Sequence, residues 1–169
     1  MATTADLLID AVDRIRDSTA RVLEGLTEEE LTFRATADAN SIAWLVWHLT
    51  RVQDDHVADV AGTEQVWTTG GWFEDFGLPF GREATGYGMS SDLVGAVRRV
   101  PAERLSAYHD AVHDRTAEYL SGLHDADLDH IVDEAWDPPV TLGVRLVSVV
   151  SDDLQHVGQA GFVRGLLPR

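Results

Sequence analysis

Apolar residues recur every three or four positions in four long stretches of the chain, the spacing of helices that bury one face. These stretches cover about residues 4–26, 42–60, 101–123 and 141–166. No segment alternates apolar and polar residues for long, so the pattern does not favour strands. We therefore predict an all-α fold, a four-helix bundle that forms a single domain over residues 1–169.

Several side chains mark where these helices should begin and end. Asn40 or Ser41 can cap the second helix, and Gly62 is a plausible end for it. Pro101 suits the first turn of the third helix. Thr27 followed three residues later by Glu30 forms a capping box, which predicts a short extra helix after the first long one.

The long connection between the second and third helices, residues 62–91, is rich in aromatic residues and glycine. Its aromatic residues are Trp67, Trp72, Phe73, Phe76, Phe80 and Tyr87, and it contains seven glycines. A connection of this length is expected either to pack on the core or to carry function. Two interpretations stay open: the aromatic side chains fill the core, or they shape a lid or a hydrophobic pocket.

Charge excludes several classes of partner. The 169 residues include 29 acidic and 13 basic side chains, and the net charge is −16. This charge argues against binding to nucleic acid or to an anionic membrane surface, because both are polyanions. No apolar run reaches the roughly 18 residues of a membrane span. The N-terminus lacks the basic start of a signal peptide, so we expect a cytoplasmic protein.

The chain contains no cysteine, and all of its basic residues are arginine. The absence of cysteine excludes disulfides, thiolate zinc sites and a cysteine nucleophile. A metal site would therefore need histidine and carboxylate ligands. The lysine-free, arginine-rich composition is typical of a GC-rich genome.

Asp152 and His156 make the sharpest candidate metal site. They lie four residues apart, so their side chains share one face of the last helix and could bind one ion. His48, in the middle of an apolar helical stretch, is the best candidate for a third ligand from another helix. The alternatives are an ordinary solvated helix surface for Asp152 and a hydrogen-bonded core position for His48.

Asp55 and His56 follow His48 after two helical turns, near the same face. Either could orient a metal ligand by a hydrogen bond or accept a proton during a reaction. His109 and His113 also lie four residues apart, but they alternate with aspartates, which favours an exposed, salt-bridged face.

Two segments resemble the metal-binding segments of the DinB-like superfamily of four-helix bundle proteins. They are residues 44–51, with the sequence WLVWHLTR, and residues 152–160, with the sequence DDLQHVGQA. Residues 105–108 and 123–128 resemble the third helix of that family and the turn after it. The resemblance covers about residues 5–167 and depends on the order and spacing of the elements rather than on one motif.

The resemblance implies a divalent metal, zinc or nickel, held by His48, Asp152 and His156. Most members of the family use three histidines, so Asp152 departs from the common pattern. A carboxylate does occur in the mycothiol-dependent maleylpyruvate isomerase branch, which uses two histidines and a glutamate. The departure is therefore compatible with metal binding, and it is also compatible with a member that has lost its metal.

The resemblance further implies an enzyme that activates a low-molecular-weight thiol, mycothiol or bacillithiol, for attack on an electrophilic small-molecule substrate. Mycothiol fits the actinobacterial host that the composition favours. Arg51, Arg82 and Arg145 are candidates for binding carboxylates of thiol or substrate. The alternative is a non-catalytic small-molecule-binding or stress-response protein on the same scaffold. Bundles of this kind often pair helix faces, so a homodimer is also an expectation.

Overall fold

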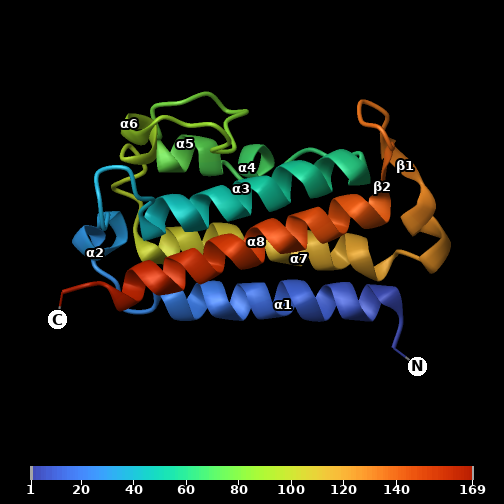
Figure 1. The fold of residues 1–169 in the computed structure, drawn as a ribbon, viewed down its shortest axis with the longest axis horizontal. Helices are drawn as coiled ribbons and strands as arrows, with labels where there is room; N and C mark the ends of the chain where they lie inside the picture. Colours follow the sequence, from blue (N-terminus) through green and yellow to red (C-terminus); the bar gives the residue numbers. More distant parts are fainter. Residues whose placement is uncertain (1, 169) are drawn as a thin grey trace.

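The computed structural model describes residues 2–168, and most of them are helical (Figure 1). The elements are α1 (Thr4–Leu23), α2 (Glu28–Thr32), α3 (Ile42–Ala61), α4 (Val66–Thr69), α5 (Trp72–Phe76), α6 (Ser91–Val94), α7 (Ala102–Ser121), the 3₁₀-helix η1 (Asp125–Asp129), β1 (Ile131–Asp133), β2 (Val140–Thr141) and α8 (Leu142–Gly165). In the described part of the chain, no helix is both long and apolar enough to cross a membrane.

Four long helices, α1, α3, α7 and α8, lie side by side (Figure 1). α3 contacts both α7 and α8, and α1 contacts the same two helices on the other side. α1 and α8 run in one direction, whereas α3 and α7 run in the other (Figure 1). Residues near the middle of α3 therefore face residues near the middle of α8, although they are far apart in the sequence.

The predicted helix ends agree with the structure where they depend on local chemistry. The Ser41 hydroxyl accepts a hydrogen bond from the Trp44 amide at the start of α3, and Gly62 ends that helix with a φ of 64°. Thr27 and Glu30 form the predicted capping box of α2. The first helix ends at Leu23, three residues before the predicted Leu26.

A small antiparallel pair of strands, β1 and β2, departs from the predicted all-α fold. The two strands precede α8, and Leu142 donates a backbone hydrogen bond to His130. The pair contains only five residues, too few to show an alternating pattern in the sequence.

The aromatic connection between α3 and α7 packs on the core through part of its length. Trp67 and Phe76 are buried, and their rings contact that of Tyr108 on α7. Phe80 lies against Trp47 of α3, with 5.1 Å between ring centroids. Tyr87, in contrast, is 94% exposed. The core-packing interpretation therefore holds for Trp67 and Phe76, and the glycine-rich part around Tyr87 lies at the surface.

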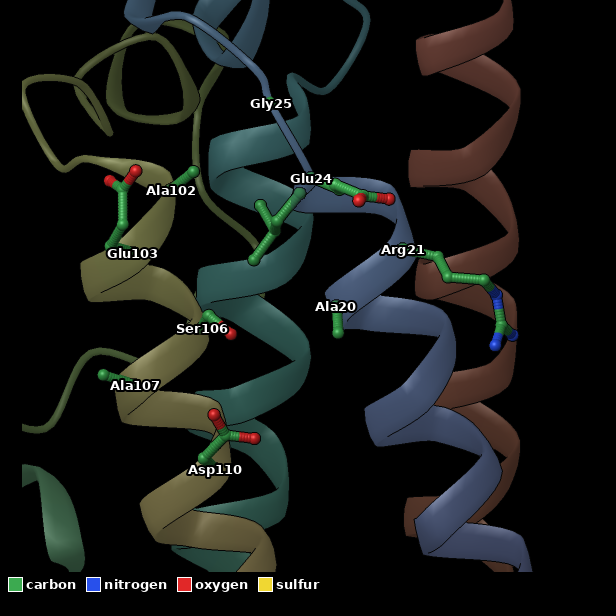
Figure 2. A pocket seen from close by; sticks show the side chains of 10 residues that line it. Ala20, Arg21, Glu24, Gly25, Ala102, Glu103, Ser106, Ala107 and Asp110 are labelled. Atoms are coloured by element: carbon green, nitrogen blue, oxygen red, sulfur yellow. The ribbon is translucent and has the colours of Figure 1, made fainter.

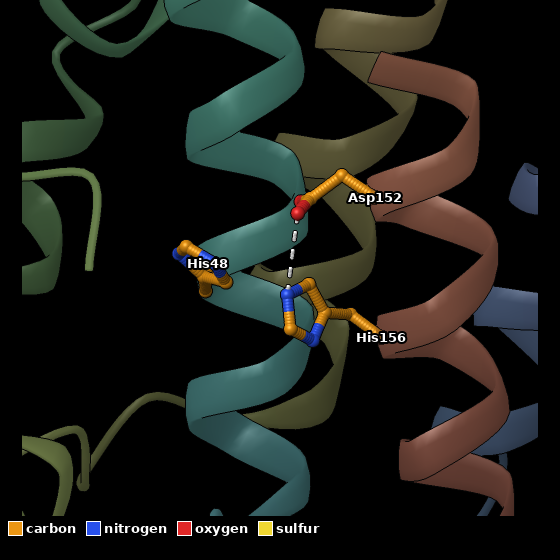
Figure 3. Close-up of side chains that lie close together, drawn as sticks. All are labelled: His48, Asp152 and His156. Carbon is orange, nitrogen blue, oxygen red and sulfur yellow. Dashed lines mark ion pairs between the residues drawn. The ribbon is translucent and has the colours of Figure 1, made fainter. Parts of the chain in front are cut away.

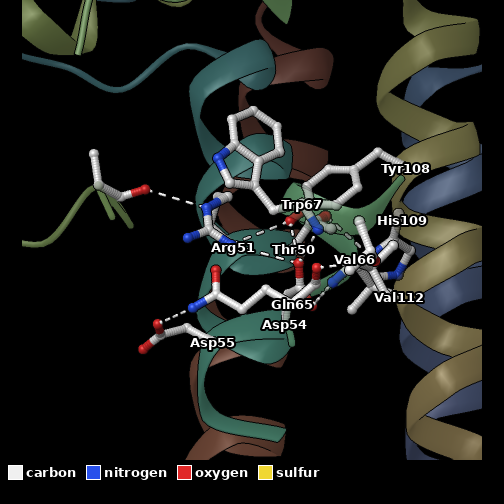
Figure 4. A network of polar contacts seen from close by, with 12 residues as sticks. Thr50, Arg51, Asp54, Asp55, Gln65, Val66, Trp67, Tyr108, His109 and Val112 are labelled. Carbon is white, nitrogen blue, oxygen red and sulfur yellow. Dashed lines mark hydrogen bonds and ion pairs between the residues drawn. The ribbon is translucent and has the colours of Figure 1, made fainter. Parts of the chain in front are cut away.

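A buried polar network fixes the start of this connection to α3 (Figure 4). The Asp54 carboxylate accepts hydrogen bonds from the backbone amides of Val66 and Trp67, at 2.8 and 2.7 Å, and from the Tyr108 hydroxyl at 2.8 Å. The Arg51 guanidinium is fully buried and lies 3.5 Å from the same carboxylate. Asp54 thus joins α3, α4 and α7 at one point.

The expectation that His109 and His113 form an exposed face is wrong, because α7 turns both side chains inward. Their exposed fractions are 1% and 4%. His109 lies 3.1 Å from the Thr50 hydroxyl on α3, and His113 lies 2.7 Å from an Asp13 oxygen on α1. The neighbouring aspartates Asp110 and Asp114 do lie at the surface, so the sequence pattern marked the wrong side of the helix.

His109 should make stability depend on pH. Burial lowers the pKa of this residue from 6.5 to about 3, so it stays neutral in the folded protein while the unfolded chain takes up a proton. The free energy of unfolding should therefore fall by about 1.4 kcal/mol per pH unit below about pH 6 because of this group. Urea unfolding between about pH 7 and pH 5 should show a smaller slope in His109→Gln than in the wild type. Parallel pH profiles for the two proteins would contradict this assignment.

Candidate metal centre

Three sequence-predicted residues, His48, Asp152 and His156, come together between α3 and α8 (Figure 3). One ligand atom from each residue lies within 4.8 Å of the others. His48 is buried, whereas Asp152 and His156 are half-buried. α3 and α8 pack side by side and antiparallel, and this packing brings a residue early in the chain close to two residues near its end.

Asp152 and His156 interact directly along α8. The Nε2 atom of His156 lies 3.5 Å from Oδ1 of Asp152, as their spacing of one helical turn allows (Figure 3). This interaction with the carboxylate raises the pKa of His156. Burial works in the other direction on Asp152, but His156 and His48 together lower the pKa of the Asp152 carboxyl group. Asp152 is therefore a carboxylate at neutral pH.

Both histidines form a hydrogen bond through Nδ1. Nδ1 of His48 lies 2.5 Å from the Thr85 carbonyl oxygen, and Nδ1 of His156 lies 3.1 Å from Oε1 of Gln159. Since both partners are oxygen acceptors in this arrangement, each Nδ1 donates the hydrogen bond, and Nε2 of His48 carries a lone pair. Nε2 of His156 faces the Asp152 carboxylate and would bind a metal in place of the proton that this carboxylate stabilises. Burial also lowers the pKa of His48, which keeps that ring neutral.

The donor set fits a divalent transition metal. Two imidazole nitrogens and one carboxylate oxygen are ligands that zinc accepts, and three protein ligands are the number typical of a catalytic zinc site. Oδ2 of Asp152 is buried and has no hydrogen-bond partner among the described residues. An ion would satisfy that oxygen, which is otherwise costly to bury.

Asp55 and His56 do not join this cluster. Together with Arg145 they line a polar pocket of about 470 Å³ farther along α3 and α8. Nη1 of Arg145 donates to Nδ1 of His56 over 2.8 Å, and Asp55 accepts a hydrogen bond from the Gln65 side chain. Arg145 lies seven residues before Asp152 on α8, about 10 Å along the helix axis. The pocket therefore adjoins the cluster without contributing a ligand.

The three arginines that the sequence offered as carboxylate binders have different surroundings. Arg51 is enclosed in the Asp54 network, and exposed Arg82 is paired with Glu74 at 2.6 Å. Arg145 faces the polar pocket, where it also donates to Asp133 at 3.0 Å. Of these three, Arg145 is the one that lines a pocket next to the cluster.

A larger open groove lies elsewhere on the molecule (Figure 2). It has a volume of about 620 Å³ and is formed by the end of α1, the residues that follow it and the start of α7. The residues that line it include Ala20, Glu103, Ser106 and Asp110. Neither α3 nor α8 contributes to this groove, so it is separate from the cluster of His48, Asp152 and His156.

Sequence reasoning missed the residues that hold the two histidines in place. Thr85 acts through its backbone carbonyl, which no side-chain pattern reveals. Gly86 lies directly against the His48 ring, and one glycine among seven in the connection gave no signal. Gln159 could have been found, because it follows His156 by three residues and so shares its helical face.

Comparison with known proteins assigns the family. The family model of the DinB superfamily matches residues 11–160. A solved structure described as the conserved protein of locus from Enterococcus faecalis is 28% identical and aligns with a TM-score of 0.92 over 98% of both chains. No curated protein matches the chain. With the family model matching most of its length, the chain belongs to the DinB superfamily.

Proposed function

We propose that this chain is a four-helix bundle enzyme that binds zinc or nickel through His48, Asp152 and His156. It uses a low-molecular-weight thiol to catalyse the transfer of a group to, or the isomerisation of, an electrophilic small molecule. The observation that carries the proposal is the convergence of three ligand atoms, two nitrogens and one oxygen, within 4.8 Å. A site with three protein ligands is typical of catalytic rather than structural zinc. The donor set also resembles that of the mycothiol-dependent branch of the superfamily, which includes a carboxylate ligand.

When bound, the metal would favour the thiolate form of a coordinated thiol, which is the nucleophilic form. The chain contains no cysteine, so the sulfur must come from a small molecule such as mycothiol. In the proposed reaction the thiol would lose its proton to solvent, and its sulfur would form a bond to an electrophilic carbon of the substrate. In a transfer reaction, the displaced group leaves with its bonding electrons.

The residues of the chain orient the metal ligands and bind the substrate. The Thr85 carbonyl and the Gln159 side-chain oxygen fix the two imidazole rings by accepting hydrogen bonds from Nδ1. The pocket lined by His56 and Arg145 adjoins the cluster and offers hydrogen-bond donors to a polar substrate group. This gives His56 a role in substrate binding, while proton transfer to it would have to span about two turns of α3.

Conjugate formation tests the proposed activity. Zinc-loaded protein mixed with mycothiol and a chloronitroaromatic electrophile is expected to yield the thioether, detected by mass spectrometry. His156→Ala should slow its formation about 100-fold or more, since metal activation supplies several kcal/mol. His130→Ala, which changes an exposed histidine outside the site, is the matched control. Equal rates in the wild type and His156→Ala would refute the proposal.

A further inference from the structure

The imidazole ring of His48 is enclosed by a neighbouring aromatic ring and by backbone from the connection between α3 and α7. One face of the ring stacks on Trp44, one turn earlier on α3, with 4.5 Å between the ring centroids and 18° between the planes. At the Nδ1 edge of the ring lies the backbone of Thr85 and Gly86, from the glycine-rich connection between α3 and α7. The ring therefore has little freedom to rotate, and its exposed fraction is 6%.

The hydrogen bond to the Thr85 carbonyl determines the tautomer of His48, that is, which ring nitrogen carries the hydrogen. A carbonyl oxygen can only accept, so the 2.5 Å contact requires Nδ1 to be the donor. The other nitrogen, Nε2, then keeps its lone pair. A histidine binds a metal through an unprotonated nitrogen, and a hydrogen bond to the opposite nitrogen both sets the tautomer and orients the ring.

Gly86 makes this close approach of the backbone sterically feasible. A Cβ atom at this position would lie 2.5 Å from Nδ1 of His48 and 3.2 Å from Cζ2 of Trp44, and both distances are shorter than ordinary contacts. The φ angle of Gly86 is 104°, a conformation that side chains with a Cβ rarely adopt. With any larger residue, the backbone or the ring would have to move.

The connection is also anchored one turn farther along α3. Nε of Arg51 donates to the Ala84 carbonyl over 3.2 Å, and Arg51 itself is paired with buried Asp54. Two side chains one turn apart on α3, His48 and Arg51, thus bind two successive carbonyls, those of Thr85 and Ala84. The Asp54 network therefore fixes the position of the carbonyl that contacts His48.

We propose that Gly86 and the Thr85 carbonyl are a positioning device for the metal ligand His48: they hold it as the Nδ1–H tautomer with Nε2 available for coordination. This inference rests on the proposed function for its role in metal binding. The aromatic and glycine-rich connection then has a defined task, to present one carbonyl to one histidine. Gly86 is a positioning residue and touches no substrate.

A pair of glycine substitutions tests the steric part. Gly86→Ala is expected to weaken zinc binding about 10- to 100-fold, as loss of a hydrogen-bonded partner of a metal ligand usually does. Gly88→Ala is the matched control, because Gly88 also has a positive φ of 68° but has nothing within 4 Å of the added Cβ. Competition with a chromophoric chelator measures the affinity, and the visible spectrum of the cobalt-substituted protein reports the ligand geometry.

The cobalt spectrum should change in Gly86→Ala and stay the same in Gly88→Ala. A merely structural role would lower thermal stability equally in both variants and leave the spectrum of the folded fraction unchanged. Equal affinities and identical spectra for the two variants would overturn the proposal.

A direct measurement of the tautomer keeps the inference testable without metal. Two-dimensional ¹H–¹⁵N spectra of the metal-free wild type at about pH 8, where histidines are neutral, should show the Nδ1–H form for His48. Observation of the Nε2–H form would overturn the inference even if zinc binds. If the Nδ1–H form is observed and no metal binds, the positioning by Thr85 stands and the proposed function fails.

Discussion

Wild-type protein is expected to carry about one equivalent of zinc or nickel after purification, and His48→Ala or His156→Ala should carry almost none. Each substitution removes one of the three ligand atoms that converge between α3 and α8. The two remaining ligands cannot enclose a divalent ion in the manner of a three-ligand zinc site. Elemental analysis by mass spectrometry measures the loss, and anomalous scattering from crystals would locate the ion.

Two controls make this result specific. His124→Ala changes an exposed histidine that lies outside the cluster, and it should leave the metal content unchanged. Circular dichroism should show the same helical content in all variants. The proposed function would be contradicted if the wild-type protein kept its fold but stayed free of metal after incubation with zinc.

The second large effect is expected at Asp54, the centre of the buried network between α3, α4 and α7. Asp54→Ala should lower the free energy of unfolding by about 3–5 kcal/mol, because it leaves the buried Arg51 guanidinium without its carboxylate. It also removes the acceptor for the amides of Val66 and Trp67 and for the Tyr108 hydroxyl. A loss of this size would consume a large part of the stability of a domain of this length.

Urea denaturation followed by tryptophan fluorescence measures this change. Asp59→Ala is the matched control, because Asp59 lies on the same helix but is exposed, and its removal should change stability by only about 0.5 kcal/mol. If Asp54→Ala were as stable as Asp59→Ala, the network would contribute little. The Asp54 variant should also weaken zinc binding, since Arg51 holds the Ala84 carbonyl next to Thr85.

The sequence predicted well those features that depend on neighbouring residues. α3 begins after Ser41 and ends at Gly62 as predicted, because capping and a left-handed C-terminal residue depend on only a few neighbouring residues. The pairing of Asp152 with His156 follows from the geometry of one helical turn. The contact of His48 with this pair depends on how α3 and α8 pack. Its position in an apolar helical stretch made His48 the best candidate, and the resemblance to a family then implied the same ligand set.

The features that were missed depend on tertiary structure. Burial of His109 and His113 is decided by the rotation of α7 against α1 and α3, which the aspartates beside them did not reveal. The Asp54 network joins residues from separate elements, and a backbone carbonyl such as that of Thr85 has no signature in a sequence. Asp153, the neighbour of Asp152 on α8, is fully buried, and its position beside another acidic residue did not reveal this.

The position of the three ligands along the chain has a consequence for folding. His48 lies in the first third of the sequence, and Asp152 and His156 lie near its end. An ion shared by them would close a loop that spans most of the polypeptide, and a link of that kind restricts the unfolded chain more than the folded one. A bound metal would then cross-link α8 to α3. The metal-loaded form would resist heat and proteases better than the metal-free form.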